Sequence, residues 1–360
     1  MGGVRTWIAD FWTRYLDTRD STLTILHSGT RPDPSLDSYI ALPRNARLSI
    51  ECLAGVRVPG SGGRLPSARA LARALGACDV CYFDNGYAFQ DAVVLNAGRK
   101  ANVAVASGHH AVIKFGGLHD LAWELLGKRL IRRFAAIHAL NANDQRYLQA
   151  LGARNVQVIP ISIDLQTFIP RPREAEFTVL FVGRFHAQKG IDRLARVVRL
   201  AQERYGRSMR FNIVGSGPLI GEVERLAALP NVVLRRPSER GTVAALMAAA
   251  HVLIVPSRWE TFGIVAAEAL AAGTPIVTTG VGATRDMAAQ GRGYVVEDPD
   301  DAAAWCGVLE KIFKRYQSDP SYSPGIAVAA RRYAERAFSF EVVASAFDAF
   351  FDTAIAAGRG

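Results

Sequence analysis

Short apolar runs alternate with helical stretches almost from end to end of the 360-residue chain. Such alternation is typical of parallel β-sheets that are covered by helices. The first half contains six candidate strands, at residues 23–26, 48–53, 80–83, 103–106, 136–140 and 156–159. The second half contains five more, at residues 179–182, 211–214, 232–234, 252–255 and 275–278. The pattern predicts an α/β chain with two doubly wound, Rossmann-like sheets.

A polar, proline-interrupted segment at residues 169–176 separates the two sets of strands and is suited to a linker. A chain of this length also exceeds what one hydrophobic core normally fills. We therefore expect a first domain at residues 1–170 and a second at residues 174–339. Ligands of doubly wound sheets bind beyond the carboxyl ends of the strands, so the expected site is a central cleft lined by those loops.

The net charge of +10 favours anionic partners, such as nucleotide phosphates or anionic lipid head groups. Nucleic acid is not expected, because Arg and Lys are scattered rather than gathered with aromatic residues. No apolar run of eighteen residues is free of charge, so neither a spanning helix nor a secretory signal is expected. Of the four cysteines, only Cys78 and Cys81 approach the spacing of a metal or redox pair, and we expect buried thiols. A reducing, cytoplasmic compartment follows.

A glycine-flanked basic loop follows the strand at residues 179–182. It runs from Gly183 to Gly190 and leads into a helical stretch, which places backbone N–H groups and the positive helix end near any bound anion. Arg184 and Lys189 add two cations to this loop. The loop therefore suits a diphosphate, although a solvated loop with ordinary surface charges is an open alternative.

Two acidic residues follow the buried strand at residues 252–255. Glu260 precedes Gly263 and can occupy the loop, whereas Glu268 projects from the second turn of the next helix. Both carboxylates can then approach one extended ligand, and their oxygens accept hydrogen bonds from hydroxyl groups of a sugar or a ribose. A helix-capping acid with an exposed helical Glu is the alternative.

Three segments together resemble family 4 retaining glycosyltransferases of the GT-B fold: residues 179–191, the stretch from Glu260 to Glu268, and residues 271–275. The similarity extends over nearly the whole chain, including residues 158–164 at the domain junction. The resemblance implies transfer of a hexose-type sugar, with retention, from a nucleotide diphosphate sugar to a glycan, lipid-linked or small-molecule acceptor, as in polysaccharide biosynthesis. It also implies that the last helix, at about residues 340–357, packs back on the first domain.

The resemblance assigns roles to several residues of the second domain. Arg184 and Lys189 would bind the donor diphosphate and offset the charge of the leaving group, so that no metal or other cofactor is expected. Glu268 would bind the nucleotide ribose. Glu260 would hold hydroxyls of the transferred sugar, with backbone N–H groups around Phe262 and Gly263.

In the first domain, the resemblance points to a histidine and a pair of glycines. His109 matches the family's histidine near the reacting sugar, with a positioning role, while His110 stays open as the alternative. Gly2 and Gly3 match paired glycines that approach the donor phosphates. Those glycines normally follow the first strand, so this domain is expected to lack that strand, or the true start lies upstream of Met1.

Two further segments are rich in aromatic or basic residues. The stripe that contains Trp7, Phe11, Trp12 and Tyr15 is expected to be core. The basic residues from Lys128 to Arg133 suit either a solvated face or peripheral contact with an anionic membrane surface. A sugar-nucleotide epimerase on the same fold and a catalytically degenerate nucleotide-sugar-binding protein are the alternatives to a transferase.

Overall fold

The structure is a computed structural model that describes residues 3–28, 48–53, 55–57, 64–84, 88–109, 123–236, 239–319 and 321–358. Gly2 and His110, which the sequence singles out, lie outside the described residues. The chain divides into two compact units, Met1–Pro160 with Val343–Gly360, and Ile161–Val342. No helix among the described residues is long and apolar enough to cross a membrane.

The first unit contains a four-stranded parallel sheet in the order β5-β6-β7-β8. Its strands are β5 (Val80–Asp84), β6 (Ala104–His109), β7 (Ala136–Ala139) and β8 (Val156–Val158). β1 (Leu23–Ser28) and β2 (Leu48–Leu53) form a separate parallel pair, and β3 (Gly55–Arg57) and β4 (Arg64–Pro66) an antiparallel one. Within the described residues, helix α1 (Gly3–Thr18) is the first element and no strand precedes it.

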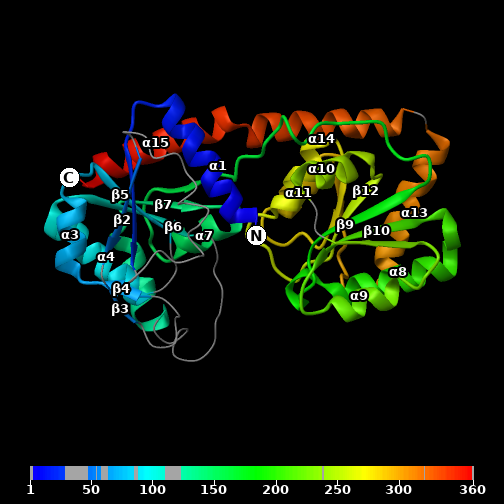
Figure 1. Cartoon of the computed structure of the whole chain (residues 1–360), viewed down its shortest axis with the longest axis horizontal. Helices are drawn as coiled ribbons and strands as arrows, with labels where there is room; N and C mark the ends of the chain where they lie inside the picture. Colours follow the sequence, from blue (N-terminus) through cyan, green and yellow to red (C-terminus); the bar gives the residue numbers. More distant parts are fainter. Residues whose placement is uncertain are drawn as a thin grey trace. The chain divides into compact units, whose positions relative to one another are not determined.

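Helices cover the first sheet (Figure 1). They are α3 (Ala68–Leu75), α4 (Ala88–Ala101), α6 (Lys128–Leu130), α7 (Ala142–Ala150) and α15 (Phe340–Gly358), with a π-helical turn at Trp123–Gly127 and a 3-10 turn at Ile131–Arg133. α1 packs on α15 through buried aromatic side chains: Phe11 lies 5.3 Å from Phe347, and the Tyr15 hydroxyl donates to Asp348 at 2.5 Å. Phe11 and Tyr15 of the predicted stripe are therefore core residues.

The second unit contains a six-stranded sheet in the order β11-β10-β9-β12-β13-β14, parallel throughout. The strands are β9 (Thr178–Arg184), β10 (Arg210–Ser216), β11 (Val232–Arg235), β12 (Val252–Val255), β13 (Ile276–Thr278) and β14 (Gly293–Val295). β12 is buried along its whole length, as expected for a parallel strand with helices on both faces (Figure 1). This arrangement confirms the predicted fold class of two Rossmann-like sheets.

The helices of the second unit alternate with these strands. They are α8 (Ile191–Tyr205), α9 (Ile220–Leu226), α10 (Arg240–Ala249), α11 (Ile264–Ala271), α12 (Thr284–Ala288), α13 (Ala302–Ser318) and α14 (Tyr322–Phe338), with 3-10 turns at Ala187–Lys189 and Gly206–Ser208. Val197 and Val198 of α8 and Trp305 and Leu309 of α13 are fully buried and belong to one hydrophobic core. The apolar faces of these helices thus complete the packing of the sheet.

The predicted linker belongs to the second unit, because one arginine attaches the linker itself and another attaches the residues just before it. Arg331 of α14 donates to the carbonyls of Leu165 and Phe168 and to that of Ala271 at the end of α11. Arg173 donates to the carbonyls that follow α10 and α11. The boundary between the compact units consequently lies at Pro160, ten residues before the one expected at residue 170.

Candidate active site in the second unit

The order of the second sheet defines where a ligand is expected. β9 and β12 are neighbours at its centre, and the chain proceeds outward from them in opposite directions. Ligands of doubly wound sheets bind at such a switch point, outside the carboxyl ends of the strands. The basic loop (residues 183–190) follows β9, and the acidic loop (residues 256–263) follows β12. The topology therefore brings the two predicted motifs to the same point.

Lys189 and Glu260 meet at this switch point. The Lys189 Nζ lies 2.5 Å from Glu260 Oε1, and the Ser257 hydroxyl donates to the same oxygen at 2.8 Å. The side chains of Lys189 and Glu260 keep 22% and 10% of their accessible surface, so the ion pair is largely removed from water. Partial burial strengthens the attraction, and it fixes a cation and a carboxylate side by side.

The two loops approach each other so closely that glycine is required. Gly190 begins α8 with φ +68°, and a Cβ there would lie 2.0 Å from the carbonyl oxygen of Pro256. Gly282 has φ +60°, and its Cβ would lie 2.3 Å from the carbonyl oxygen of Glu260. Only glycine tolerates both the left-handed conformation and the backbone contact. The loop of Glu260 is therefore packed between two backbone segments.

Arg184, Phe262 and Gly263 occupy distinct surroundings around this point. Arg184 ends β9 and its side chain is exposed. Phe262 is 2% exposed and lies edge-on to Phe338 at 5.5 Å, so its side chain belongs to the core and only its backbone is available to a ligand. Gly263 directly precedes α11, whose first N–H groups point toward the same end of the sheet.

Glu268 lies on α11 in a different environment from Glu260. Its side chain is 14% exposed, and its carboxylate lies 3.9 Å from the guanidinium of Arg240 at the start of α10. Burial raises the pKa of Glu268 to about 7; Arg240 opposes this rise and the nearby Asp164 adds to it. The sequence did not predict Arg240, because it lies 28 positions before Glu268 and in no motif.

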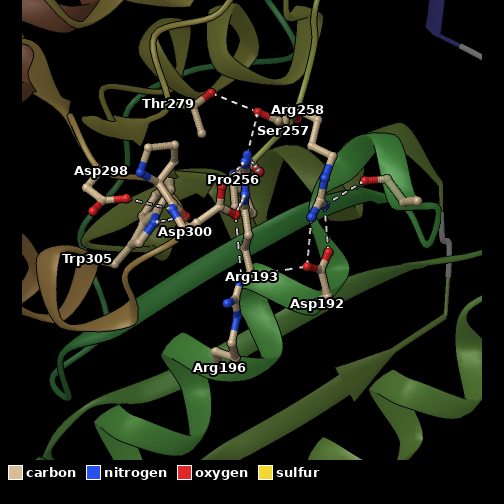
Figure 2. A network of polar contacts seen from close by, with 12 residues as sticks. Asp192, Arg193, Arg196, Pro256, Ser257, Arg258, Thr279, Asp298, Asp300 and Trp305 are labelled. Atoms are coloured by element: carbon tan, nitrogen blue, oxygen red, sulfur yellow. Dashed lines mark hydrogen bonds and ion pairs between the residues drawn. The ribbon is translucent and has the colours of Figure 1, made fainter.

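A network of arginines and aspartates supports the acidic loop from below (Figure 2). Arg193 is 8% exposed and donates to both carboxylate oxygens of Asp300, at 2.8 and 3.1 Å, and to the carbonyl of Pro256 at 3.3 Å. The Thr279 hydroxyl donates to the carbonyl of Ser257 at 2.8 Å. The backbone that leads from β12 to Glu260 is thus held by side chains of two other segments.

The predicted site residues of the first unit lie at the end of β6 and at the start of α1. His109 is the last residue of β6, is 3% exposed, and stacks on Trp123 with ring centroids 5.5 Å apart. Gly3 is the first residue of α1. The thiols of Cys78 and Cys81 are partly buried, and burial raises the pKa of Cys81 to about 12, so this thiol stays protonated at neutral pH.

The basic segment of the first unit has an inner and an outer face. Ile131 is 1% exposed and belongs to the core of the first unit, whereas Leu125 is 60% exposed. Lys128 pairs with Glu124 at 2.5 Å, and Arg129 and Arg133 are exposed. An apolar side chain therefore lies in the exposed surface of the same short segment as two exposed cations.

Comparison with known proteins identifies the second unit. Residues 176–314 match the family "Glycosyl transferases group 1". A GDP-mannose-dependent α-(1-6)-phosphatidylinositol dimannoside mannosyltransferase of Mycobacterium tuberculosis is 31% identical over 58% of this chain and 59% of its own length. A D-inositol 3-phosphate glycosyltransferase of Xylanimonas cellulosilytica is 30% identical over 53% and 51%. The chain thus spans between half and three fifths of these curated relatives.

The solved structures that resemble this chain cover almost all of it. A sucrose-phosphate synthase from Thermosynechococcus elongatus has a TM-score of 0.77 at 20% identity and covers 99% of this chain and 94% of its own. HepE of Anabaena, in complex with UDP, has a TM-score of 0.75 at 17% identity and covers 98% and 96%. Residues 176–314 of the second unit are thus similar to the group 1 glycosyltransferases, and the chain has the GT-B fold of these solved structures.

Proposed function

We propose that this protein transfers a hexose-type sugar from a nucleotide diphosphate sugar to a glycan, lipid-linked or small-molecule acceptor, with retention of anomeric configuration. The observation that carries the proposal is the contact of Lys189 with Glu260 at the switch point of the second sheet. One group binds phosphate and the other binds hydroxyls, and a nucleotide diphosphate sugar offers both within one molecule. The match of residues 176–314 to a glycosyltransferase family supports a transferase over an epimerase.

The cations act on the leaving group. In the transfer, the bond between the anomeric carbon and the diphosphate oxygen breaks, and a bond to the acceptor oxygen forms. The acceptor hydroxyl gives its proton to the departing diphosphate. Arg184 and Lys189 offset the negative charge that develops there, which is the largest electrostatic demand of the step. We therefore propose that the reaction proceeds without a metal ion, and that a chelator leaves its rate unchanged.

Glu260 has the capacity to bind sugar while it stays in place. Its Oε1 already accepts from Lys189 and Ser257, but an ionised carboxylate offers about four acceptor positions. The remaining positions can accept from hydroxyls of the transferred sugar, together with the N–H groups near Gly263. Glu268 is proposed to accept from the ribose hydroxyls, and His109 to position the sugar.

The donor set for a test comes from the relatives. One is named for GDP-mannose dependence, and HepE has been solved with UDP and with UDP-glucose. Purified protein would be incubated with GDP-mannose, UDP-glucose or UDP-N-acetylglucosamine and a panel of acceptors, with NMR detection of the product's anomeric configuration. An α-linked product from an α-linked donor is expected, and Lys189→Met and Glu260→Gln should each lower kcat/KM by about 10²- to 10³-fold.

Three outcomes would contradict all or part of this proposal. If a donor binds in calorimetry but its sugar is never transferred to any acceptor, the protein is a binding protein. If the donor is converted to its epimer in the absence of acceptor, it is an epimerase. A β-linked product from an α-linked donor would refute retention while leaving transfer intact.

The proposal extends to peripheral contact with an anionic membrane surface. Leu125 can enter the interface while Arg129 and Arg133 stay among anionic head groups. Sedimentation with phosphatidylglycerol vesicles should pull down the protein, and phosphatidylcholine vesicles should not. A double variant, Arg129→Glu with Arg133→Glu, should lose this binding; retention of binding by that variant would refute the assigned surface.

A further inference from the structure

Arg258 joins the acidic loop to the basic loop by its backbone and its side chain. Its N–H donates to the carbonyl of Gln188 at 2.8 Å, and its guanidinium donates to the carbonyl of Ala187 at 3.2 Å. The two ends of the guanidinium also donate to the two carboxylate oxygens of Asp192, at 2.6 and 2.8 Å (Figure 2). In return, the Gln188 side chain donates to the carbonyl of Trp259 at 3.3 Å.

These contacts lie next to the two residues of the proposed chemistry. Arg258 is two positions before Glu260, Gln188 is one before Lys189, and Asp192 is three after Lys189. We propose that Arg258 is a positioning residue, which holds Glu260 and Lys189 at the separation that one donor molecule requires. This inference rests on the proposed function, and it assigns a role to a position that no motif of the sequence marked.

The geometry favours positioning over stabilisation. Arg258 and Asp192 keep 38% and 46% of their side-chain surface, and exposed ion pairs contribute little to the free energy of folding because water and salt screen them. A bidentate arginine–carboxylate pair, by contrast, fixes the orientation of both partners. Loss of Arg258 should therefore displace the two loops more than it lowers the stability of the second unit.

Other side chains hold the start of the acidic loop, so Arg258 can be replaced without removing those contacts. Arg193 is buried, pairs with Asp300 and holds the carbonyl of Pro256, so that its replacement would unfold this region rather than test positioning. Arg196 offers a matched control on the same helix. Its guanidinium lies 3.7 Å from Asp192 and 3.5 Å from Asp300, and no contact with the acidic loop is recorded for it in the described part of the chain.

The test compares Arg258→Met, Arg258→Lys and Asp192→Asn with Arg196→Met. We expect kcat/KM for the donor to fall by about 10²-fold in Arg258→Met, because misplacement by about 1 Å costs that much. Arg258→Lys should recover only part of the loss, since lysine cannot form the bidentate pair. The double variant Arg258→Met with Asp192→Asn should be no worse than Arg258→Met, because the two residues act as one unit. Arg196→Met should stay within about twofold of wild type.

Hydrogen exchange keeps this inference separate from the proposed function. The backbone amide of residue 258 should exchange faster than in the wild type in Arg258→Met and in Asp192→Asn, but not in Arg196→Met. This expectation holds whether or not the wild type transfers sugar. If the wild type transfers nothing, the proposed function fails and this exchange pattern still decides the contact. If Arg258→Met keeps wild-type kcat/KM, or if Arg196→Met loses as much, the positioning role is overturned.

Discussion

Glu268 carries a stability cost that follows from its burial, and its replacement by glutamine should reveal that cost. The side chain is 14% exposed, and Arg240 at 3.9 Å only partly offsets the carboxylate's loss of water. Its pKa is raised from 4.5 to about 7. This difference corresponds to about 3 kcal/mol between the two protonation states. Above about pH 7 the folded protein therefore carries a buried negative charge at Glu268, which the unfolded chain would expose to water.

The sign of the pH dependence follows from these two pKa values. Below pH 4.5 the carboxyl is protonated in both states, and burial of the ionised form costs nothing. As the pH rises from 4.5 to about 7, the unfolded chain loses its proton first, and the wild type is progressively destabilised. Glutamine has a similar shape and no charge. Glu268→Gln should thus match the wild type at pH 4 and exceed its stability by about 3 kcal/mol at pH 8.

The assay is thermal or urea unfolding of both proteins across this pH range, without nucleotide. For a unit of this size, 1 kcal/mol shifts the midpoint of thermal unfolding by roughly 2–4 °C, so a gain of several degrees at pH 8 is expected. Glu297→Gln is the matched control, since Glu297 is 77% exposed and pairs with Arg285 at the surface. A gain that is the same at pH 4 and pH 8, or a loss at pH 8, would refute the reasoning.

The same variant should lose donor affinity. A hydrogen bond to a charged group contributes about 1.5–3 kcal/mol, so loss of the ionised acceptor should raise the donor Kd by roughly 10- to 100-fold. Calorimetry with the nucleotide diphosphate at pH 8 measures this directly. Higher stability together with weaker binding is the expected combination, and a purely structural role for Glu268 predicts no change in Kd.

Two further predictions concern the backbone around the site. Gly190→Ala should lower the free energy of unfolding by more than about 2 kcal/mol and abolish donor binding, because its Cβ meets the carbonyl oxygen of Pro256; Gly291→Ala, with φ +79° and open space around it, should show only the strain of about 1–2 kcal/mol. Equal losses in these two variants, measured by urea unfolding, would disprove the clash. Arg173→Met should cost about 2–4 kcal/mol in the same assay, since helix-end carbonyls lose a charged donor; a neutral effect would show that other groups satisfy them.

Most strands of the two units could be predicted, because strands that are covered by helices are apolar. Parallel strands under helices are continuous apolar runs, and the eleven predicted strands coincide with β1, β2 and β5 to β13, with ends that differ by a few residues. The strands β3, β4 and β14 were not predicted, since each has three residues and shows no detectable period. The division into compact units at Pro160 lies ten residues before the expected boundary for a different reason: the arginines that attach this segment to the second unit bind carbonyls, which no side-chain pattern reveals.

The candidate site also contains residues that could be predicted from the sequence and residues that could not. Lys189 and Glu260 could be named because glycine, charge and the end of a strand coincide around them in the sequence. Arg258 and Asp192 are 66 positions apart, and each is an ordinary surface charge when taken alone. Their pairing exists only because β9 and β12 are neighbours in the sheet. Contacts created by topology lie beyond what local spacing can reveal.

The features that look unfavourable locally gather at the switch point, and this distribution itself supports a binding site there. Gly190 precedes α8 in a left-handed conformation, and Glu268 is largely buried beside Arg240. The close backbone approach leaves no room for a side chain at residue 190, and the buried carboxylate of Glu268 lowers stability. Arginines outside the immediate site offset part of this cost through bonds to carbonyls and carboxylates. Leucine at this position would avoid the cost of the buried charge; the proposed hydrogen bonds from the ribose would offset that cost and give the carboxylate a function.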